Sequence, residues 1–406
     1  MQTDEAKACG LIDARGEAPW RVVGGIPLVT RLVRGLELAG LERIVVVCDR
    51  ALEPEALEAV RRETRLATRR LEPDAPLTEA AAELSGDREF LVAEGSLVVD
   101  LRLQAALARS PAPTFVPCPG RAAVRLARLS VDQLAGYGAP SDPALGWQTL
   151  EPESLDTWST KLRGYQEILL LDASSPEAAA RAETLLIQRT QKLVMDWPAR
   201  WIDPHFENAM VRWLAPTRIG PDAVTWFGAA IALAGAALLW KGWLVAAIPL
   251  MLLTGWLDGV DGKLVRLRLK GGWVGDAESV VDFFVENSWW AALAAWFHGA
   301  GMGETAIWVW AVFFAGSLID DSTYFLADIF LGENIDLLTP ADGAFRLVAG
   351  RRNVYVWYLT VAFLTGFAWE GFVLCAVWAI LTGPTHAVRL LVALRAKRAQ
   401  KQDFGG

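Results

Sequence analysis

The sequence from Asp258 to Arg266 reads DGVDGKLVR and directly follows an apolar run. It brings two carboxylates, two glycines and an arginine together. Further acids enter the next apolar run at Glu278, Asp282 and Glu286. Carboxylates at the depth of a bilayer are costly and usually face a polar interior, and clustered carboxylates suit hard cations such as Mg²⁺. This stretch therefore predicts metal-dependent chemistry on a phosphate compound at a membrane.

The spacing of these acids predicts a site between two helices. Asp258 and Asp261 are three residues apart, and the later acids recur every four residues, so each set lies on one face of a helix. Two such faces packed together would hold one or two divalent cations, whose charge offsets that of a pyrophosphate during phosphoryl transfer. Gly259 and Gly262 allow a backbone or a phosphate to approach closely.

The two halves of the 406-residue chain differ in composition. Residues 1 to about 172 have mixed charges and short apolar segments, whereas residues 221 to 395 form long apolar runs. The formal net charge of -8 argues against a nucleic-acid-binding protein. The four cysteines lack paired spacing, so we expect reduced, buried thiols. The first ten residues contain no signal-peptide core, so the N-terminal half is expected in the cytoplasm.

Six apolar runs follow one another in the second half, at roughly 223–240, 243–257, 279–300, 305–331, 354–369 and 372–394. We expect six membrane-spanning helices, although some runs are shorter than the ~20 residues of an ideal span. Basic residues gather in the connections after runs two, four and six; those after run two are Lys263, Arg266, Arg268 and Lys270. The positive-inside rule then places both termini on the cytoplasmic side of the inner membrane. Aromatic and charged residues alternate in about 178–219, which predicts amphipathic helices at the interface.

The motif resembles the signature of the CDP-alcohol phosphotransferases (CDP-alcohol phosphatidyltransferases), D-x2-D-G-x2-A-R-x8-G-x3-D-x3-D. Residues 221–225 read PDAVT, which is similar to the Pro-Asn-x-x-Thr start of that family's first span. The resemblance covers roughly residues 180–395. It implies a membrane transferase that moves a substituted phosphate from a CDP-alcohol donor to an alcohol or phosphorylated alcohol and releases CMP, as in phospholipid or inositol-phosphate synthesis. Two Mg²⁺ or Mn²⁺ ions and a homodimer are also implied.

The resemblance further implies a role for individual residues. The metal ligands would be Asp258, Asp261, Glu278 and Asp282, and Asp282 would also be the general base that activates the acceptor hydroxyl. The residues that contact CDP would be Thr225, Gly262 and Arg266. Arg351 and Arg352 lie where related enzymes bind the acceptor's phosphate, although they would equally serve as topology markers.

The second half of the motif departs from the family pattern. A strict count along the signature places Ser279 and Phe283 at the acidic positions, where neither would be a ligand. A shifted register that pairs Glu278 with Asp282 restores an acid pair, and a register that pairs Asp282 with Glu286 is the alternative. A catalytically inactive membrane scaffold or a transporter is the alternative from a different functional class.

The first half shows strand-like segments at 43–48, 89–94, 114–117 and 167–171, with helical patterns at 28–39 and 53–64. This alternation predicts a Rossmann-like α/β domain with a mainly parallel sheet, ahead of an all-α six-helix transmembrane domain. Residues 24–34, GGIPLVTRLVR, and 39–47, AGLERIVVV, resemble the sugar-nucleotide and cytidylyl transferases. Fusion of the two domains resembles the bifunctional inositol-phosphate cytidylyltransferase and di-inositol-phosphate phosphate synthase proteins.

The nucleotidyltransferase-like half nevertheless departs from its family. The Gly-rich loop that would cradle a triphosphate has no clear match in residues 8–16, and the metal-binding Asp is replaced by Glu94 or by Asp100, a weak substitute. We therefore expect a degenerate domain at residues 1–172 with a structural, dimerising or substrate-docking role. A linker would cover 173–220 and the transferase domain 221–398. A bifunctional enzyme that also makes the CDP-alcohol from CTP is the alternative.

Overall fold

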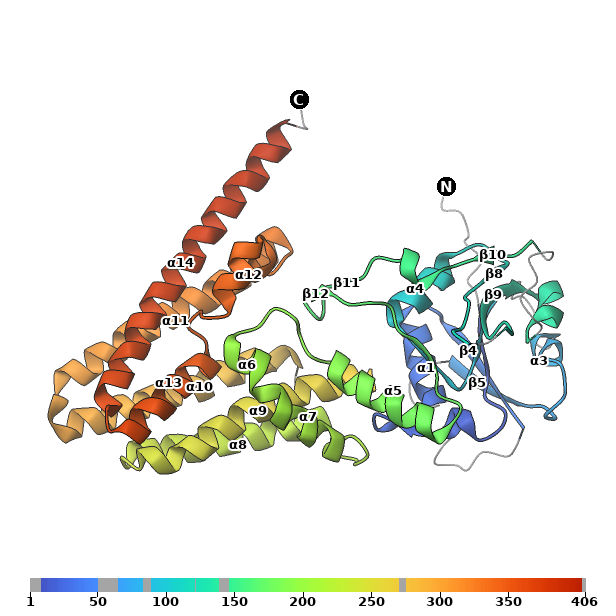
Figure 1. The fold of residues 1–406 in the computed structure, drawn as a ribbon. Coiled ribbons are helices and arrows are strands. Elements are labelled where there is room, and N and C mark those ends of the chain that lie inside the picture. The colour runs from blue at the N-terminus through green and yellow to red at the C-terminus, as the bar shows by residue number, and fades with distance from the viewer. Residues whose placement is uncertain are drawn as a thin grey trace.

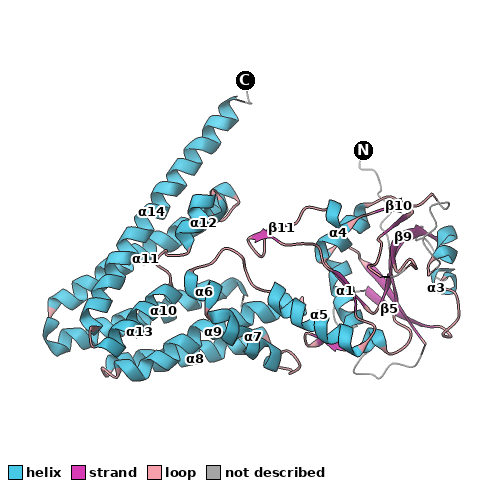
Figure 2. Cartoon of the chain, viewed as in Figure 1, coloured by secondary structure: helices cyan, strands magenta, loops and turns pink. Residues whose placement is uncertain are grey.

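The structure is a computed structural model that describes residues 9–49, 65–82, 89–120, 122–138, 146–269 and 275–403. Within these ranges, nothing is described of the side chains of 65–66, 82, 275–282 and 400–403. An α/β half and an all-helical half lie side by side (Figures 1 and 2).

Seven strands of the N-terminal half form one sheet in the order β10-β8-β9-β6-β1-β4-β5. Their bounds are β1 Cys9–Asp13, β4 Arg43–Cys48, β5 Arg65–Arg70, β6 Glu89–Glu94, β8 Thr114–Phe115, β9 Leu126–Ser130 and β10 Gln148–Thr149. β1 pairs in parallel with β4 and β6, as do β4 with β5 and β8 with β10, whereas β9 runs antiparallel to β6 and β8. The prediction of a mainly parallel α/β sheet is confirmed.

Helices cover both faces of this sheet, which explains the uninterrupted apolar run of β4. Ile44 and Val46 face a core shared with α1 (Leu28–Leu38) and α4 (Leu101–Arg109). Val45 and Val47 face the opposite core, which includes residues of α3 (Thr78–Ala82). Three pairs of short strands lie outside the main sheet: β2 Val22–Val23 with β3 Ile26–Pro27, β7 Leu97–Val99 with β13 Leu170–Asp172, and β11 Trp158–Ser159 with β12 Gly164–Tyr165. Short 3-10 turns are η1 Ala18–Trp20, η2 Val131–Gly136 and η4 Pro152–Ser154.

Two strand predictions need correction and one helix is untested. The segment predicted at 114–117 is a strand only over Thr114–Phe115, where it pairs with β9 and β10. The segment predicted at 167–171 is a strand over Leu170–Asp172, because its partner β7 is only three residues long. The helix predicted at 53–64 lies outside the described residues. The central strand β1 was not predicted from its five-residue apolar pattern.

In the described part of the C-terminal half, all secondary structure is helical, and loops join the helices. Its elements are α5 Pro176–Arg189, α6 Trp197–Trp201, α7 Asp203–Leu214, α8 Pro221–Trp240, α9 Leu244–Arg268, α10 Gly275–Phe297, η5 His298–Met302, α11 Glu304–Leu331, η6 Ile335–Leu337, α12 Pro340–Arg346, α13 Arg352–Thr365 and α14 Ala368–Asp403. Each predicted apolar run lies largely within one helix: α8, α9, α10, α11, α13 or α14. Three helices in the described part of the chain are long and apolar enough to cross a membrane: 221–240, 244–268 and 368–399. The total of six spans stays a prediction.

The helix α9 extends well beyond its apolar run, which corrects the placement of several basic residues. Lys263, Arg266 and Arg268 belong to the last turns of α9 rather than to a connecting loop. Each is engaged by another element. Lys263, for example, forms an ion pair with Glu207 of α7 at 2.8 Å and is 1% exposed. The residues that mark topology in the sequence therefore also hold α9 against its neighbours.

The predicted linker contains the helices α5, α6 and α7, and their position at a membrane interface stays a prediction. One side of α7 buries Val211 and Leu214 against α9, whereas Phe206 and Trp213 are exposed, as an interfacial helix would leave them. All four cysteines are free and buried, which confirms the expectation of buried thiols.

The two halves meet at the turn Gly24–Gly25, which joins β2 and β3. Both glycines have positive φ, of 62° and 84°, as a tight hairpin turn requires. An added Cβ would overlap the side chain of Leu267 at Gly24 and the carbonyl oxygen of Ala215 at Gly25. Nearby, Arg34 of α1 donates a hydrogen bond to the carbonyl oxygen of Arg268 at 2.5 Å. The segment that resembles a nucleotidyltransferase therefore forms a contact between the two halves.

Candidate functional site

Asp261 links the first two long helices of the C-terminal half. Its carboxylate accepts a hydrogen bond from the hydroxyl of Thr225 in α8 at 2.6 Å and from the Gly262 N–H at 2.5 Å. The residue is 3% exposed. Because α8 and α9 are consecutive antiparallel helices, the start of one meets the end of the other. The structure thus brings together three residues that the sequence analysis selected for metal or CDP binding.

Asp258 lies one turn earlier on α9 and contacts a different helix. Its carboxylate pairs with the guanidinium of Arg352, the first residue of α13, at 2.6 Å, and its side chain is 37% exposed. Glu286 of α10 lies within electrostatic reach of both groups. A predicted metal ligand and a predicted acceptor-binding arginine are therefore neighbours.

Arg351 points to another group of residues. Its guanidinium donates to Asp320 of α11 at 3.1 Å, and Asp320 also contacts Nδ1 of His386 in α14 at 2.5 Å. Asp320 is 4% exposed and His386 3% exposed. Among the described side chains, the adjacent arginines 351 and 352 thus pair with different carboxylates, and it is Arg352 that pairs with an acid of the DGVDGKLVR stretch.

Arg266 belongs to α9, the helix that carries the DGVDGKLVR stretch, and follows Gly262 by one turn. An added Cβ at Gly262 would lie 3.2 Å from Nη1 of Arg266, and Nε of Arg266 donates to the Thr190 carbonyl at 2.7 Å. Gly262 therefore leaves room for this guanidinium. Gly259 serves a different contact, because an added Cβ there would overlap the carboxylate of Glu207. The close approach at Gly259 is to α7 and not to a phosphate.

The remaining predicted metal ligands lie partly outside the described side chains. Glu278 and Asp282 fall in the first turns of α10, but their side chains are not among those described, so the register of the second acidic pair stays open. The described side chains contain no group of three or more His, Cys, Asp or Glu residues suited to a metal. The carboxylate oxygens of Asp258 and Asp261 are the donor type that Mg²⁺ prefers, so the described part of the donor set fits such an ion.

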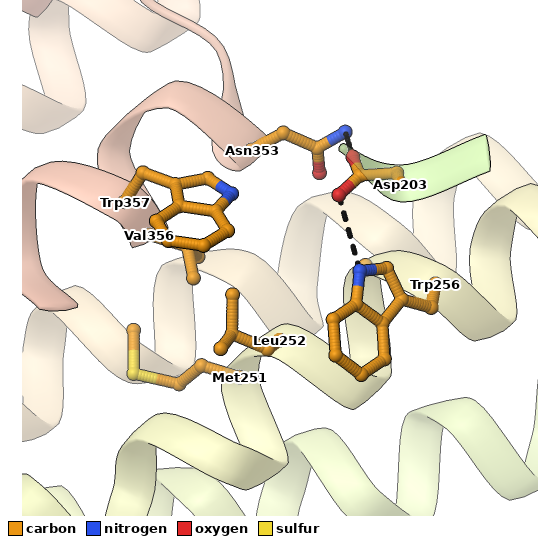
Figure 3. A pocket seen from close by; sticks show the side chains of 8 residues that line it. Asp203, Met251, Leu252, Trp256, Asn353, Val356 and Trp357 are labelled. Carbon is orange, nitrogen blue, oxygen red and sulfur yellow. Dashed lines mark hydrogen bonds between the residues drawn. The ribbon is translucent and has the colours of Figure 1, made fainter. Parts of the chain in front are cut away.

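A small pocket lies beside the motif, between α7, α9 and α13 (Figure 3). It is lined by Asp203, Met251, Leu252, Gly255, Trp256, Asn353, Val356 and Trp357. Asp203 accepts hydrogen bonds from Nε1 of Trp256 at 3.1 Å and Nδ2 of Asn353 at 3.4 Å. Burial, together with the charge of Glu207, raises the pKa of Asp203 to about 7. The pocket therefore combines apolar walls with an acid that changes charge near neutral pH.

Several of these polar residues were missed in the sequence. Asp320, Asp321 and His386 lie inside predicted apolar runs, and ionisable residues at such depth are a recognised signal of a polar interior. Asp203 and Glu207 are buried acids of the linker. Their burial could not be read from the pattern of that segment, because acids in a helix usually face solvent.

The N-terminal half places its candidate residues in ion pairs of its own. Asp13, at the end of β1, pairs with Arg15 at 2.7 Å, and the Gly16 N–H donates to Asp49 at 2.8 Å. Glu94 pairs with Arg125 at 2.5 Å, and Asp100 caps α4 while pairing with Arg102 at 2.8 Å. The carboxylates of Asp13, at the end of β1, and Asp49, after β4, thus flank the loop in which the sequence analysis sought the triphosphate-binding glycines.

Comparisons with known proteins gave matches only among solved structures. No model of a protein family matches the chain, and no curated protein does. Phosphatidylinositol phosphate synthase of Mycobacterium tuberculosis, solved with CDP-DAG bound, is similar with 18% identity over 46% of this chain and 94% of that one, at a TM-score of 0.38. HddC of Yersinia pseudotuberculosis is similar with 13% identity over 44% of this chain and 99% of that one, at a TM-score of 0.31. A putative glucose-1-phosphate thymidylyltransferase of Bacillus anthracis is similar with 10% identity over 44% of this chain and 95% of that one, at a TM-score of 0.32.

Proposed function

We propose that this chain is an integral membrane CDP-alcohol phosphotransferase. It transfers a substituted phosphate from a CDP-alcohol to an acceptor alcohol and releases CMP, which gives a phosphodiester of the phospholipid or inositol-phosphate type. The supporting observation is that residues of the DGVDGKLVR stretch meet side chains of two distant helices. Asp261 contacts Thr225 of α8, and Asp258 contacts Arg352 of α13.

The acids of α9 and α10 would hold the metal ions. Asp258, Asp261, Glu278 and Asp282 would bind two Mg²⁺ or Mn²⁺ ions, with Glu286 as the alternative partner of Asp282. When bound, such ions supply positive charge that offsets the charge of the pyrophosphate. The hydroxyl of Thr225 fixes the orientation of the Asp261 carboxylate by its hydrogen bond.

The remaining residues act on the two substrates. Asp282 would accept the proton of the acceptor hydroxyl, which makes that oxygen a better nucleophile. Gly262 and Arg266 would contact the CDP group. Arg352 lies against Asp258 and so would meet a phosphorylated acceptor beside the reacting phosphate, whereas Arg351 would act from the adjacent network.

The N-terminal half would serve this reaction without catalysing a second one. Its residues 1–172 would form a degenerate nucleotidyltransferase-like domain, followed by the linker 173–220 and the transferase domain 221–398. Glu94 and Asp100, the two residues considered in place of the metal-binding Asp, are engaged in ion pairs with Arg125 and Arg102. The protein would work as a homodimer in the bilayer with both termini in the cytoplasm.

The test is CMP release by the purified protein in detergent. CDP-diacylglycerol and CDP-inositol are offered in turn with a panel of alcohols, in Mg²⁺, Mn²⁺ or EDTA. We expect release with one donor in the presence of metal and none in EDTA. A folded protein that releases no CMP with any pair would contradict the proposal and favour a membrane scaffold. CTP-dependent formation of a CDP-alcohol would instead establish the bifunctional alternative.

A further inference from the structure

A hairpin of the N-terminal half reaches the helical half. Its strands are β11 and β12, and Figure 1 shows it extending from the α/β half toward α12. At its tip, the Leu162 carbonyl accepts a hydrogen bond from the Leu193 N–H at 2.8 Å. An added Cβ at Gly164 would lie 2.8 Å from the Leu193 side chain. The hairpin is therefore packed closely against the segment Thr190–Trp197.

The segment Thr190–Trp197 also contacts both elements that carry predicted site residues. The Thr190 carbonyl accepts the hydrogen bond from Nε of Arg266 in α9. The Trp197 N–H donates to the Leu347 carbonyl, in the connection between α12 and α13, at 2.9 Å. One short segment thus joins the hairpin, the motif helix and the loop that precedes Arg351. This arrangement brings Lys192 within electrostatic reach of Arg266, and Arg163 within reach of Arg346 and Arg351.

Arg163 and Lys192 differ from the arginines around them. Those arginines each have a carboxylate partner: Arg346 pairs with Asp336, Arg351 with Asp320 and Arg352 with Asp258. Among the described residues, neither the Arg163 guanidinium nor the Lys192 ammonium has a hydrogen-bond or ion-pair partner. Neither positive charge is therefore paired with a described carboxylate at ion-pair distance, although Asp258 attracts Lys192 and Asp336 attracts Arg163 from farther away.

Positive charges crowd this junction. Burial, with the charges of Arg163 and Arg266, lowers the pKa of Lys192 to about 8, although Asp258 opposes the shift. Burial and the charge of Arg346 lower the pKa of Arg163. Arg163 also has a φ of 57°, a left-handed conformation that is unfavourable for a residue with a side chain. A bound anion would compensate these repelling charges, and a phosphate accepts several charge-assisted hydrogen bonds.

We propose that Arg163 and Lys192, together with Arg266, bind a phosphate group at the junction of the two halves. The N-terminal half thereby completes the substrate site of the helical half. This inference rests on the proposed function, which makes the phosphate part of a transferase substrate. The phosphate belongs either to the pyrophosphate of the CDP-alcohol donor or to a phosphorylated acceptor, and the same cations suit both.

The experiment measures ligand binding to the full-length protein in detergent by isothermal titration calorimetry. The probes are inorganic phosphate, CDP and glycerol 3-phosphate. The variants are Arg163→Asn, because Asn tolerates a left-handed φ, and Lys192→Gln. The matched control is Lys161→Gln, an exposed cation of the same hairpin. We expect each variant to raise the Kd of inorganic phosphate about tenfold or more, since a hydrogen bond between charged groups is lost, and the control to stay within about twofold.

The two organic probes distinguish the sources of the phosphate. A weakened Kd for CDP with an unchanged Kd for glycerol 3-phosphate assigns the cations to the donor, and the reverse assigns them to the acceptor. Unchanged Kd values for all probes, equal weakening in Lys161→Gln, or no binding by the unaltered protein would overturn the site. A protein that binds phosphate through Arg163 but releases no CMP would refute the proposed function and leave the site standing. A protein that releases CMP, and whose variants bind all three probes as the unaltered protein does, would support the proposed function and refute the phosphate site.

Discussion

The end of β1 and the end of α9 both carry aspartates near an expected nucleotide site, but the contacts of these aspartates differ. Asp13 pairs with Arg15, two residues away, and so closes its own loop. Asp261 bonds to Thr225 and Asp258 pairs with Arg352, in helices far apart in the sequence. Contacts between neighbours along the chain stabilise a turn, whereas contacts between distant helices assemble a site. On the function proposed above, chemistry would belong to the helical half and support to the α/β half.

The sharpest test of this comparison is the same substitution in both regions. Asp261→Asn should lower CMP release on the order of 100- to 1,000-fold, because a metal ligand stabilises the transition state by several kcal/mol. Asp13→Asn should leave the rate within about twofold and cost about 0–1 kcal/mol of stability, as a partly exposed ion pair does. Rates are measured at saturating donor, with circular dichroism to confirm folding. Equal losses from both substitutions would refute the division of roles.

A second test concerns the buried pair that holds α9 against α7. Glu207→Gln leaves Lys263, which is 1% exposed, without its carboxylate, and should destabilise the protein by about 3–5 kcal/mol. The double variant Glu207→Met with Lys263→Met should recover most of this loss, because no buried charge is then unpaired. Thermal unfolding followed by tryptophan fluorescence measures both. A double variant less stable than the single one would show that the pair itself stabilises the contact between α7 and α9.

The contact between the two halves is tested at a pair of glycines with positive φ. Gly25→Ala places a Cβ against the Ala215 carbonyl, whereas at Gly40, with φ of 93°, no atom lies within 4 Å of the added group. Both substitutions should lower the free energy of unfolding by about 1–2 kcal/mol, because alanine is unfavourable in the left-handed conformation. Gly25→Ala should cost a further ~1–3 kcal/mol from overpacking. Equal melting temperatures for the two variants would show that the halves do not dock through this turn.

A further test is the pH dependence of stability that Asp203 should confer. Its pKa of about 7 in the folded protein lies above the ordinary value of 3.8, so the folded state binds more protons than the unfolded state between these values. Stability should therefore fall as pH rises from about 4 to 7, with the loss complete above 7. Asp203→Asn should flatten this part of the profile, whereas Asp74→Asn, at an exposed site, should not. If the melting temperature of Asp203→Asn changed with pH in the same way as that of the unaltered protein, Asp203 would not be the source of the pH dependence.

The sequence by itself determined the division into an α/β half and a helical half. Alternating strands and helices, and a set of long apolar runs, follow from local periodicity, which depends on which side chains face a core. It also selected Asp258 and Asp261, because acids beside an apolar run stand out without any knowledge of packing, and it selected Thr225 through the resemblance of residues 221–225 to the start of a known family's first span. Residues 278 and 282 stay predictions, since their side chains lie outside those described.

Only the tertiary structure decided which residues meet. Arg351 and Arg352 are equivalent in the sequence. Arg351 nevertheless precedes α13 and contacts Asp320, whereas Arg352 is the first residue of α13 and contacts Asp258. Lys263 reads as a surface charge but is buried against Glu207. Lys192 precedes the motif by more than 60 residues, yet it lies within electrostatic reach of Asp258 and Arg266. Such contacts depend on the angles at which distant elements pack, and local side-chain patterns do not encode those angles.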